Sequence, residues 1–335
     1  MILPLVSILI PFKNTSEYIG ECLDSILQQK HQYWEAICID DDSEDDSANI
    51  VKRYVDSDKR FQLHKNKGHG IINALRLALE KSKGHFITRM DSDDIMLQNR
   101  LELLFKNLKN HGQKHLAIGQ VEYFRADGLS NGYERYQNWI NGLTKKGINY
   151  SEIYKECVIP SPCWMIHRQD LIDCDAFNPN RYPEDYDLTF RFYKSNYKCI
   201  PCSEVLLKWR DYSTRTSRTH EHYAQNYFLD IKTHYFLELD YDASRPLTIW
   251  GAGNKGKTIA KILLKHQIKF YWICDNPKKI GKNIYDQTLL NFDALDDIEN
   301  PQTIVTVANE DAQKEIKKYF RKLNMKSMED YFFFC

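Results

Sequence analysis

The sequence predicts an α/β protein built on a doubly wound sheet. Short apolar, β-branched runs alternate with segments whose apolar residues recur every three or four positions, which is the pattern of strands alternating with helices. Acidic turns follow two of the apolar runs, as expected at the carboxyl ends of strands in such a sheet. The alternation fades in the middle of the chain and begins again after Arg245-Pro246. Two α/β units are therefore expected, and the second is the smaller.

The first part of the chain supplies strands and helices in turn. Val6 to Ile10 is an apolar run that predicts a buried strand, ended by Pro11. Ser16 stands where a helix cap is expected, ahead of apolar residues with helical spacing through Leu27. The same reasoning predicts strands over residues 34–39, 61–64 and 84–90 and helices through residues 50–55, 71–81 and 101–108.

The middle of the chain has a different character. Between residues 117 and 218 the helical periodicity weakens and aromatic residues become frequent, which is typical of a half that shapes a substrate pocket. A polar and aromatic helix over residues 220–239 is expected to link this half to the next unit. We therefore predict a first domain over residues 1–219, a helical linker over 220–244 and a second domain over 245–335. Strands are predicted in the middle region over residues 117–124, 163–167, 197–201 and 205–209.

Composition and charge exclude several classes of protein. The chain has 335 residues, of which 42% are hydrophobic, enough to bury a core and to exclude intrinsic disorder. Its 46 basic residues balance 46 acidic ones without a long basic block, so no nucleic-acid partner is expected. No apolar run reaches the roughly 18 residues of a membrane-spanning helix. The apolar start, with Pro4 and Pro11 and no basic segment, predicts a buried strand rather than a signal peptide, and hence a cytoplasmic protein.

The cysteines and the aromatic tail each have two interpretations. Nine cysteines, an odd number, indicate reduced thiols rather than a disulfide framework. Cys199 and Cys202 form a Cys-x-x-Cys pair, but a second pair with metal-ligand spacing is missing, so a zinc or redox site is the less favoured interpretation. The tail over residues 331–334 predicts a terminal strand packed on a sheet, with a weak interfacial membrane contact as the alternative.

Two acidic turns carry the first chemical signal. Residues 40–46 hold five aspartates and one glutamate, which repel one another unless a cation, a hydrogen-bond donor or solvent relieves them. Asp91 and Asp93 end an apolar strand and offer two hard oxygen ligands on one turn, which suits Mg²⁺ or Mn²⁺ bound to phosphate oxygens. Taken alone, the first cluster is equally explained as a solvated turn that caps the following helix, and the second is better explained as a helix cap. Because both follow strands, both should face one crevice.

A series of motifs extends in order over roughly the first 220 residues. The motifs include Val6-Ser-Ile-Leu-Ile-Pro-Phe-Lys-Asn14, Ile39-Asp-Asp-Asp-Ser43, Lys83-Gly-His-Phe-Ile-Thr-Arg-Met-Asp-Ser-Asp-Asp-Ile95, Pro183-Glu-Asp-Tyr-Asp-Leu188 and Trp209-Arg-Asp-Tyr-Ser213. In this order they resemble the family 2 glycosyltransferases, the large inverting group with the GT-A fold. The resemblance implies that residues 1–219 form a GT-A domain with a doubly wound mixed sheet, and that the chain is a hexosyltransferase-type enzyme.

The resemblance also implies a role for individual residues. Asp41 matches the carboxylate that accepts a hydrogen bond from the donor nucleobase, and Pro11 borders that base. Asp91 matches the residue near the donor ribose or sugar, and Asp93 the ligand of the metal, Mn²⁺ or Mg²⁺, that bridges the diphosphate. Asp185 matches the catalytic base. Glu184 stands beside it. Such a base removes the proton of an acceptor hydroxyl that attacks the anomeric carbon from the opposite face, so that configuration inverts.

The chain departs from the family pattern at three positions. Lys13 stands where an aromatic residue is frequent, which would replace base stacking by a charge near the base or the phosphates. Arg76 stands where asparagine is usual, and Asp211 where the family often has histidine. Arg215 or Arg218 could supply positive charge in place of that imidazole, although a solvated arginine is the simpler interpretation.

The second unit carries a glycine motif between a predicted strand and a predicted helix. Gly251-x-Gly253-x-x-Gly256 has Asp275 about twenty residues further on, at the end of the next strand. Glycines in this context allow a tight turn whose amides face a phosphate, while the aspartate binds ribose hydroxyls. The unit thus resembles a Rossmann-type module that binds a nucleotide or NAD. The alternative is an accessory domain that keeps the glycine turn for packing.

These observations favour an inverting transferase that moves a sugar from a nucleotide-diphosphate sugar to a saccharide or lipid-linked acceptor in surface polysaccharide synthesis. Such an enzyme is expected in the cytoplasm at the inner face of the membrane, with peripheral contact at most. One alternative is a nucleotide-dependent oxidoreductase or epimerase centred on Gly253. Another is a catalytically inactive binding subunit, against which the presence of Asp41, Asp93 and Asp185 argues.

Overall fold

The structure of the protein is a computed structural model that describes residues 4–125, 128, 131–213, 215 and 225–335. Its contacts divide the chain into two compact units. The first unit comprises Met1–Asn149 and Val158–Arg218, and the second comprises Tyr150–Cys157 and Thr219–Cys335. The short segment Tyr150–Cys157 therefore leaves the first unit and returns to it.

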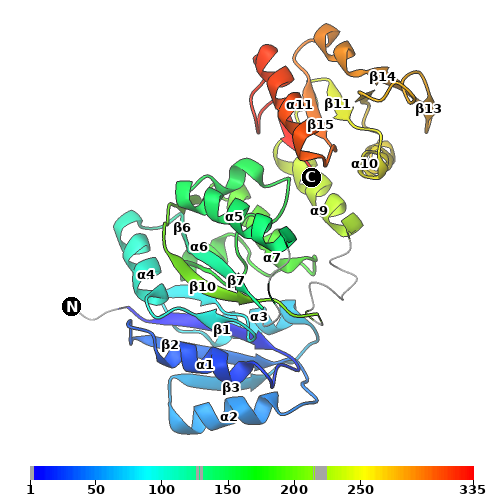
Figure 1. Ribbon diagram of the computed structural model, residues 1–335. Helices are drawn as coiled ribbons and strands as arrows, with labels where there is room; N and C mark the ends of the chain where they lie inside the picture. Colours follow the sequence, from blue (N-terminus) through cyan, green and yellow to red (C-terminus); the bar gives the residue numbers. More distant parts are fainter. Residues whose placement is uncertain (1–3, 126–127, 129–130, 214, 216–224) are drawn as a thin grey trace. The chain divides into compact units, whose positions relative to one another are not determined.

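A mixed seven-stranded sheet with the order β3-β2-β1-β4-β8-β6-β9 forms the centre of the first unit (Figure 1). Strands β1 to β4 run parallel, whereas β8 is antiparallel to both of its neighbours. Strands β2 and β4 lie on either side of β1, so the winding direction reverses there, which is where a ligand crevice forms in doubly wound sheets. The strands are β1 (Val6–Phe12), β2 (Trp34–Asp40), β3 (Phe61–Lys65), β4 (Phe86–Arg89), β6 (His115–Ile118), β8 (Trp164–His167) and β9 (Lys198–Ile200).

Four helices connect these strands where the sequence predicts them. Helix α3 packs on β1 and β2, while α1 packs against α2. Helix α1 begins later than Ser16 suggests: the backbone N–H of Ser16 donates to Asp45 Oδ2 at 2.9 Å, and Tyr18 takes the cap position without a side-chain bond. The acidic turn after β2 thus binds Ser16, and the helix begins after Tyr18 instead. The helices are α1 (Ile19–Leu27), α2 (Ser47–Ser57), α3 (Ile71–Lys81) and α4 (Arg100–His111).

A second, three-stranded sheet in the first unit has the order β5-β10-β7. Strand β10 (Val205–Arg210) is antiparallel to β5 (Ile95–Met96) and parallel to β7 (Gln120–Phe124). Strand β5 follows directly on the second acidic turn. The pairing of β10 with β5 therefore holds the residues that follow β10, from Asp211 on, next to that turn. The predicted strand over 117–124 is in fact split at Gly119 between β6 and β7.

In the described part of the middle region, three α-helices occur where the sequence predicts strands and loops. The longest, α5 (Asn131–Lys146), buries Ile140 and packs the partly buried Tyr133, Tyr136 and Trp139 against the core. Aromatic residues thus form the apolar stripe of this helix. They favour strands by propensity, and tertiary packing overrides that preference. The other two helices are α6 (Arg168–Asp173) and α7 (Glu184–Lys194).

The second unit contains a six-stranded sheet with the order β13-β14-β12-β11-β15-β16. All of its neighbouring pairs are parallel except the β13–β14 hairpin. The aromatic tail is confirmed as a terminal strand, since β16 pairs with β15. The elements are α9 (Gln225–Leu239), β11 (Leu247–Trp250), α10 (Asn254–Lys265), β12 (Tyr271–Cys274), β13 (Asn283–Ile284), β14 (Gln287–Asn291), η3 (Phe292–Asp297), β15 (Gln302–Val305), α11 (Glu310–Lys322) and β16 (Tyr331–Phe333).

The glycine turn between β11 and α10 has a clear packing role. Gly251 has φ +120°, and a Cβ on Gly256 would lie 2.0 Å from the carbonyl oxygen of Gly251. We expect Gly256→Ala to destabilise the second unit by about 1–3 kcal/mol or more, because backbone must move to admit the methyl group. Gly253→Ala is the matched control, since a Cβ there meets no atom within 4 Å. Thermal unfolding of both variants tests this, and equal melting temperatures would contradict it.

The cysteines and the helices add two further findings. All nine cysteines are free thiols, and Cys199 and Cys202 are both buried. Over the described residues, no helix has the length and apolar character that crossing a membrane requires.

Candidate active site

Two acidic turns lie at the carboxyl edge of the first sheet, on either side of β1. Strand β2 ends at Asp40 and β4 ends at Arg89, and each is a hydrogen-bonded neighbour of β1. The backbone N–H of Asp41 donates to the carbonyl oxygen of Phe12 at 2.9 Å, which extends the β1–β2 ladder to the end of β1. The topology thus places both acidic turns at the point where the winding reverses.

Asp41 is held by donors on the loop that follows β3. Its Oδ1 accepts from Asn66 Nδ2 at 2.7 Å, and the Gly70 N–H donates to both carboxylate oxygens at 3.0 Å. The side chain is 9% exposed. Gly70 has φ +86°, a backbone region that favours glycine. Asn66 is a site residue that sequence reasoning missed; its position directly after a strand at this edge was the available signal.

The residues at the end of β1 differ from one another in exposure. Pro11 is buried inside the strand, in register with Ile39 of β2, whereas Lys13 is exposed on the following turn. The third aspartate of the first turn, Asp42, pairs with Lys65 at 3.0 Å. Hydrogen bonding and attraction from Lys65 hold the pKa of Asp42 below its ordinary value. The first turn thus contains one carboxylate fixed by protein donors and one neutralised by a lysine.

A buried arginine joins the second acidic turn to the start of α7. Arg89 Nε donates to Asp91 Oδ1 at 2.7 Å, and Arg89 Nη1 donates to Glu184 Oε1 at 3.1 Å. Arg89 and Glu184 are 4% and 3% exposed. Burial alone would lower the Arg89 pKa, but the carboxylates of Asp91 and Glu184 outweigh it, so the pKa is raised. The other oxygen of Glu184, Oε2, is buried without a hydrogen-bond partner among the described residues.

Asp185 follows Glu184 in the first turn of α7. Its Oδ1 accepts from the Tyr186 N–H at 2.8 Å. Burial raises the pKa of Asp185 from 3.8 to about 7, with the Glu184 charge adding to the rise and Arg89 opposing it. A carboxyl group that titrates near neutrality suits general acid–base chemistry at ordinary pH.

The segment after β10 covers the last carboxylates of the second turn. Tyr212 Oη donates to Asp93 Oδ2 at 2.9 Å, and Arg215 Nε lies 3.9 Å from the same oxygen. Asp94 Oδ1 accepts from the Arg210 N–H at 2.8 Å. Burial raises the pKa of Asp93, against the opposing charge of Arg215.

The second turn fits a divalent metal. Asp91, Asp93 and Asp94 offer hard oxygen atoms, and Asp94 Oδ2 is buried without a hydrogen-bond partner among the described residues. Over that same part of the chain, no three acidic, histidine or cysteine side chains converge as a complete ligand set. A metal here would take few ligands from the protein and the rest from phosphate and water, which is the usual arrangement for Mg²⁺ at phosphate sites.

Two of the residues that depart from the family pattern, Arg76 and Asp211, have structural partners. Arg76 of α3 reaches the loop before α7, where its guanidinium donates to the carbonyl oxygens of Phe177 and Asn178 and, at 3.0 Å, to Asn180 Oδ1. Asp211 Oδ2 pairs with Arg125 at 3.4 Å. Arg215 is the partner of Asp93, while Arg218 lies outside the described residues.

The glycine turn of the second unit forms a separate group of predicted residues. Gly253 caps α10 and is exposed, Gly251 and Gly256 are buried, and Asp275 is exposed just after β12. Lys279 Nζ donates to the carbonyl oxygen of Ala252 at 2.8 Å. A nucleotide or NAD at this turn stays a prediction.

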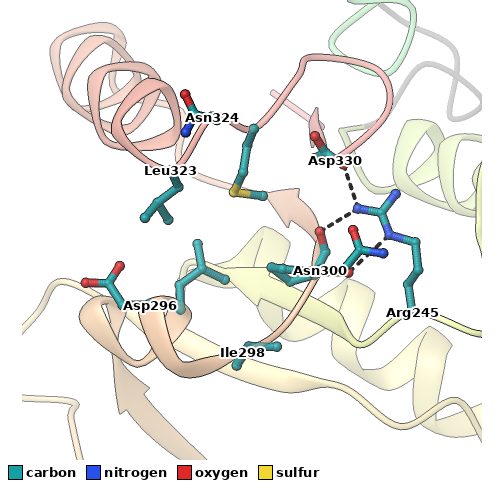
Figure 2. Close-up of a pocket in the computed structure, with 10 residues that line it drawn as sticks. Arg245, Asp296, Ile298, Asn300, Leu323, Asn324 and Asp330 are labelled. Carbon is teal, nitrogen blue, oxygen red and sulfur yellow. Dashed lines mark hydrogen bonds and ion pairs between the residues drawn. The ribbon is translucent and has the colours of Figure 1, made fainter.

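A hollow of about 300 Å³ lies elsewhere in the second unit (Figure 2). Arg245 at its edge donates to Asn300 O, Pro301 O and Asp330 Oδ1, so its guanidinium is occupied by the protein itself. The hollow adjoins the residues before β11 and β15, at the strand ends opposite the glycine turn. It is therefore no candidate for the ligand edge of that sheet.

Comparison with known proteins decides the family. Residues 7–174, half of the chain, match the description "Glycosyl transferase family 2". The chain belongs to this family. The glycosyltransferase is 30% identical over 218 residues to the Escherichia coli UDP-Glc:alpha-D-GlcNAc-diphosphoundecaprenol beta-1,3-glucosyltransferase WfgD. The match covers 62% of this chain and 77% of WfgD.

Two solved structures confirm the predicted fold. TarS of S. aureus, residues 1–349 in complex with UDP-GlcNAc, superimposes with a TM-score of 0.56 at 18% identity, over 79% of this glycosyltransferase and 72% of that chain. The mannosyltransferase PcManGT of Pyrobaculum calidifontis, in complex with GDP-Man and Mn²⁺, gives a TM-score of 0.50 at 18% identity, over 78% of this chain and 70% of PcManGT. The enzyme thus has the GT-A fold.

Proposed function

We propose that this glycosyltransferase moves a sugar, with inversion, from a nucleotide-diphosphate sugar to a hydroxyl of a saccharide or lipid-linked acceptor in surface polysaccharide synthesis. The observation that carries the proposal is the gathering of Asp41, Asp91, Asp93 and Asp185 around one sheet edge, through the contacts of Arg89, Asn66 and Tyr212. A lipid-linked acceptor, as in the name of WfgD, would bring the cytoplasmic enzyme to the inner face of the membrane.

The donor base is assigned to the first acidic turn. Asn66 and Gly70 hold the Asp41 carboxylate in place at the end of β2, where it can accept a hydrogen bond from a nucleobase N–H. Pro11 would border the base and Lys13 would approach the base or the phosphates. Because WfgD is named for UDP-Glc and the TarS structure contains UDP-GlcNAc, UDP-sugars are the donors to test first.

The diphosphate is assigned to the second acidic turn. Asp93 would bind a divalent metal, Mn²⁺ or Mg²⁺, while Asp91 would face the donor ribose or sugar. PcManGT, which shares the fold, binds Mn²⁺ together with its donor. When bound, such an ion would neutralise charge on the leaving diphosphate. Tyr212 and Arg215 would have to leave the Asp93 oxygen that they contact, or share it.

Asp185 is assigned as the base that accepts the proton of the acceptor hydroxyl. The acceptor oxygen forms a bond to the anomeric carbon while the bond from that carbon to the diphosphate oxygen breaks. The diphosphate leaves with the electron pair, and the hydroxyl proton passes to the Asp185 carboxylate. Arg89 holds Glu184, and this contact fixes the start of α7, where Asp185 lies. Attack opposite to the leaving group inverts the configuration.

Donor hydrolysis tests this proposal without knowledge of the acceptor. We expect the full-length protein to release nucleoside diphosphate slowly from one or a few nucleotide sugars, with Mn²⁺ or Mg²⁺ and not with EDTA. UDP-Glc, UDP-GlcNAc and GDP-Man form the first panel. Isothermal titration with UDP, GDP and NAD should show metal-dependent binding of one diphosphate. Binding of NAD alone, with no hydrolysis of any nucleotide sugar, would instead favour the oxidoreductase alternative.

The domain boundaries at residues 219 and 244 are likewise proposals. By contacts, the first unit ends at Arg218, and the second unit takes in Thr219–Cys335, which includes the proposed linker, together with Tyr150–Cys157. We propose that the second unit lies outside the transfer chemistry, because the proposed donor, metal and base residues all belong to the first unit.

A further inference from the structure

Arg89 occupies an unusual place for a strand residue. It is the last residue of β4, it is 4% exposed, and its guanidinium binds two carboxylates that come from distant parts of the chain. Asp91 lies two residues away on the second acidic turn, whereas Glu184 lies 95 residues away at the start of α7. This one side chain thus connects the proposed donor turn to the helix that carries the proposed base.

The two contacts use different nitrogen atoms of the guanidinium. Nε donates to Asp91 at 2.7 Å and Nη1 to Glu184 at 3.1 Å. Two contacts from one planar group fix the direction as well as the distance between their partners. A lysine could supply the charge but not this fork. Arg89 therefore contributes both a positive charge and a fixed geometry. Arg89→Gln removes both, whereas Arg89→Lys removes the geometry alone.

We propose that Arg89 is a positioning residue for sugar transfer: it holds Glu184, and with it the neighbouring Asp185, in place beside the donor carboxylate Asp91. The inference rests on the proposed function, in which Asp185 accepts the proton. Arg89 itself touches no reacting atom in this scheme. Its effect passes through the start of α7.

The charge of Arg89 also acts on the titration of Asp185. The charged groups that act on Asp185 are Glu184 from the same helix, Arg89 from β4 and Asp91 from the following turn. The two carboxylates raise the pKa of Asp185, and the guanidinium is the group that lowers it. Removal of the positive charge should therefore raise that pKa further. The base form, and with it turnover, would then be lost at a higher pH than in the parent protein.

The test compares Arg89→Gln with Arg89→Lys in the full-length protein, with donor hydrolysis followed against pH. In Arg89→Gln we expect the acidic limb of the kcat profile to move up by roughly one pH unit. In Arg89→Lys we expect the limb to stay in place while kcat on the plateau falls about tenfold with little change in KM, because charge remains and the fork is lost. Arg168→Gln, at a half-buried arginine that donates to Ser82 and Leu79, is the control and should change neither.

The outcomes separate failure of this inference from failure of the proposed function. Asp185→Asn is measured alongside: if it hydrolyses donor like the parent, the base assignment is wrong and the inference falls with it. If Asp185→Asn is inactive but Arg89→Gln keeps the parent limb and plateau, Arg89 has a structural role only. If Arg89→Gln does not fold, Arg89→Lys decides: a parent-like plateau overturns the proposal, and a lowered plateau with an unmoved limb supports it.

Discussion

Asp185→Asn should lower the kcat of donor hydrolysis by about a hundredfold or more, while the affinity for the donor stays nearly unchanged. The substitution removes a proton acceptor but little volume. In the parent protein the acidic limb of the profile should lie near pH 7, because the pKa of Asp185 is raised to about 7. A base must be unprotonated to act, so turnover should fall as the pH drops through that value. Steady-state kinetics from about pH 5 to 9 measure both effects.

Glu184→Gln serves as the matched comparison for Asp185. Glu184 is the adjacent residue on α7, but its Oε1 is already occupied by Arg89 at 3.1 Å. We expect Glu184→Gln to reduce kcat less than Asp185→Asn does. Should Glu184→Gln prove inactive and Asp185→Asn active, the roles of the two residues must be exchanged.

Asp93→Asn should weaken metal-dependent nucleotide binding by about tenfold or more and reduce turnover by a similar or larger factor. The carboxylate is buried, and asparagine keeps its shape and can still accept from Tyr212 Oη, so the fold should persist. Isothermal titration of the protein with UDP, once in the presence of Mn²⁺ and once in the presence of EDTA, distinguishes the metal-dependent part of binding. In Asp93→Asn the two titrations should become alike.

A second aspartate provides the control for Asp93. Asp46→Asn changes an exposed carboxylate before α2, where the side chain makes no capping hydrogen bond, and should leave both titrations as in the parent. Parent-like binding and turnover in Asp93→Asn would remove the metal assignment from this residue.

Strands β1, β2, β4 and β8 of the first sheet could be predicted from the sequence because each is a largely apolar run bounded by a turn. The acidic turns could be placed at one edge for the same reason, since parallel strands end on the same side. Arg89 could not be found in this way: it ends an apolar strand, and its partner Glu184 is 95 residues away. The same holds for the contact between Tyr212 and Asp93, which only the pairing of β10 with β5 brings about.

The helix α5 shows a second limit of prediction from the sequence. Its apolar stripe consists largely of Tyr133, Tyr136 and Trp139, residue types that are typical of strands. These residues form a helix because their helical spacing lets them pack together against the core, and the core is not visible in the local sequence. The capping error at Ser16 has a similar origin, because its competitor Asp45 lies on a different turn.

The return of the chain through Tyr150–Cys157 has a genetic consequence. In the second unit, Tyr154 stacks on Phe334 with ring centroids 5.2 Å apart, and Lys232 Nζ donates to the carbonyl oxygen of Lys155 at 2.8 Å. A single recombination event near residue 219 would exchange the carboxyl-terminal part of the gene but leave this segment behind, without the aromatic and lysine partners it packs against. Inheritance of the second unit as a working module therefore requires three crossovers, near residues 150, 157 and 219. The alternative is one crossover near 219 together with coordinated change of the eight residues of Tyr150–Cys157.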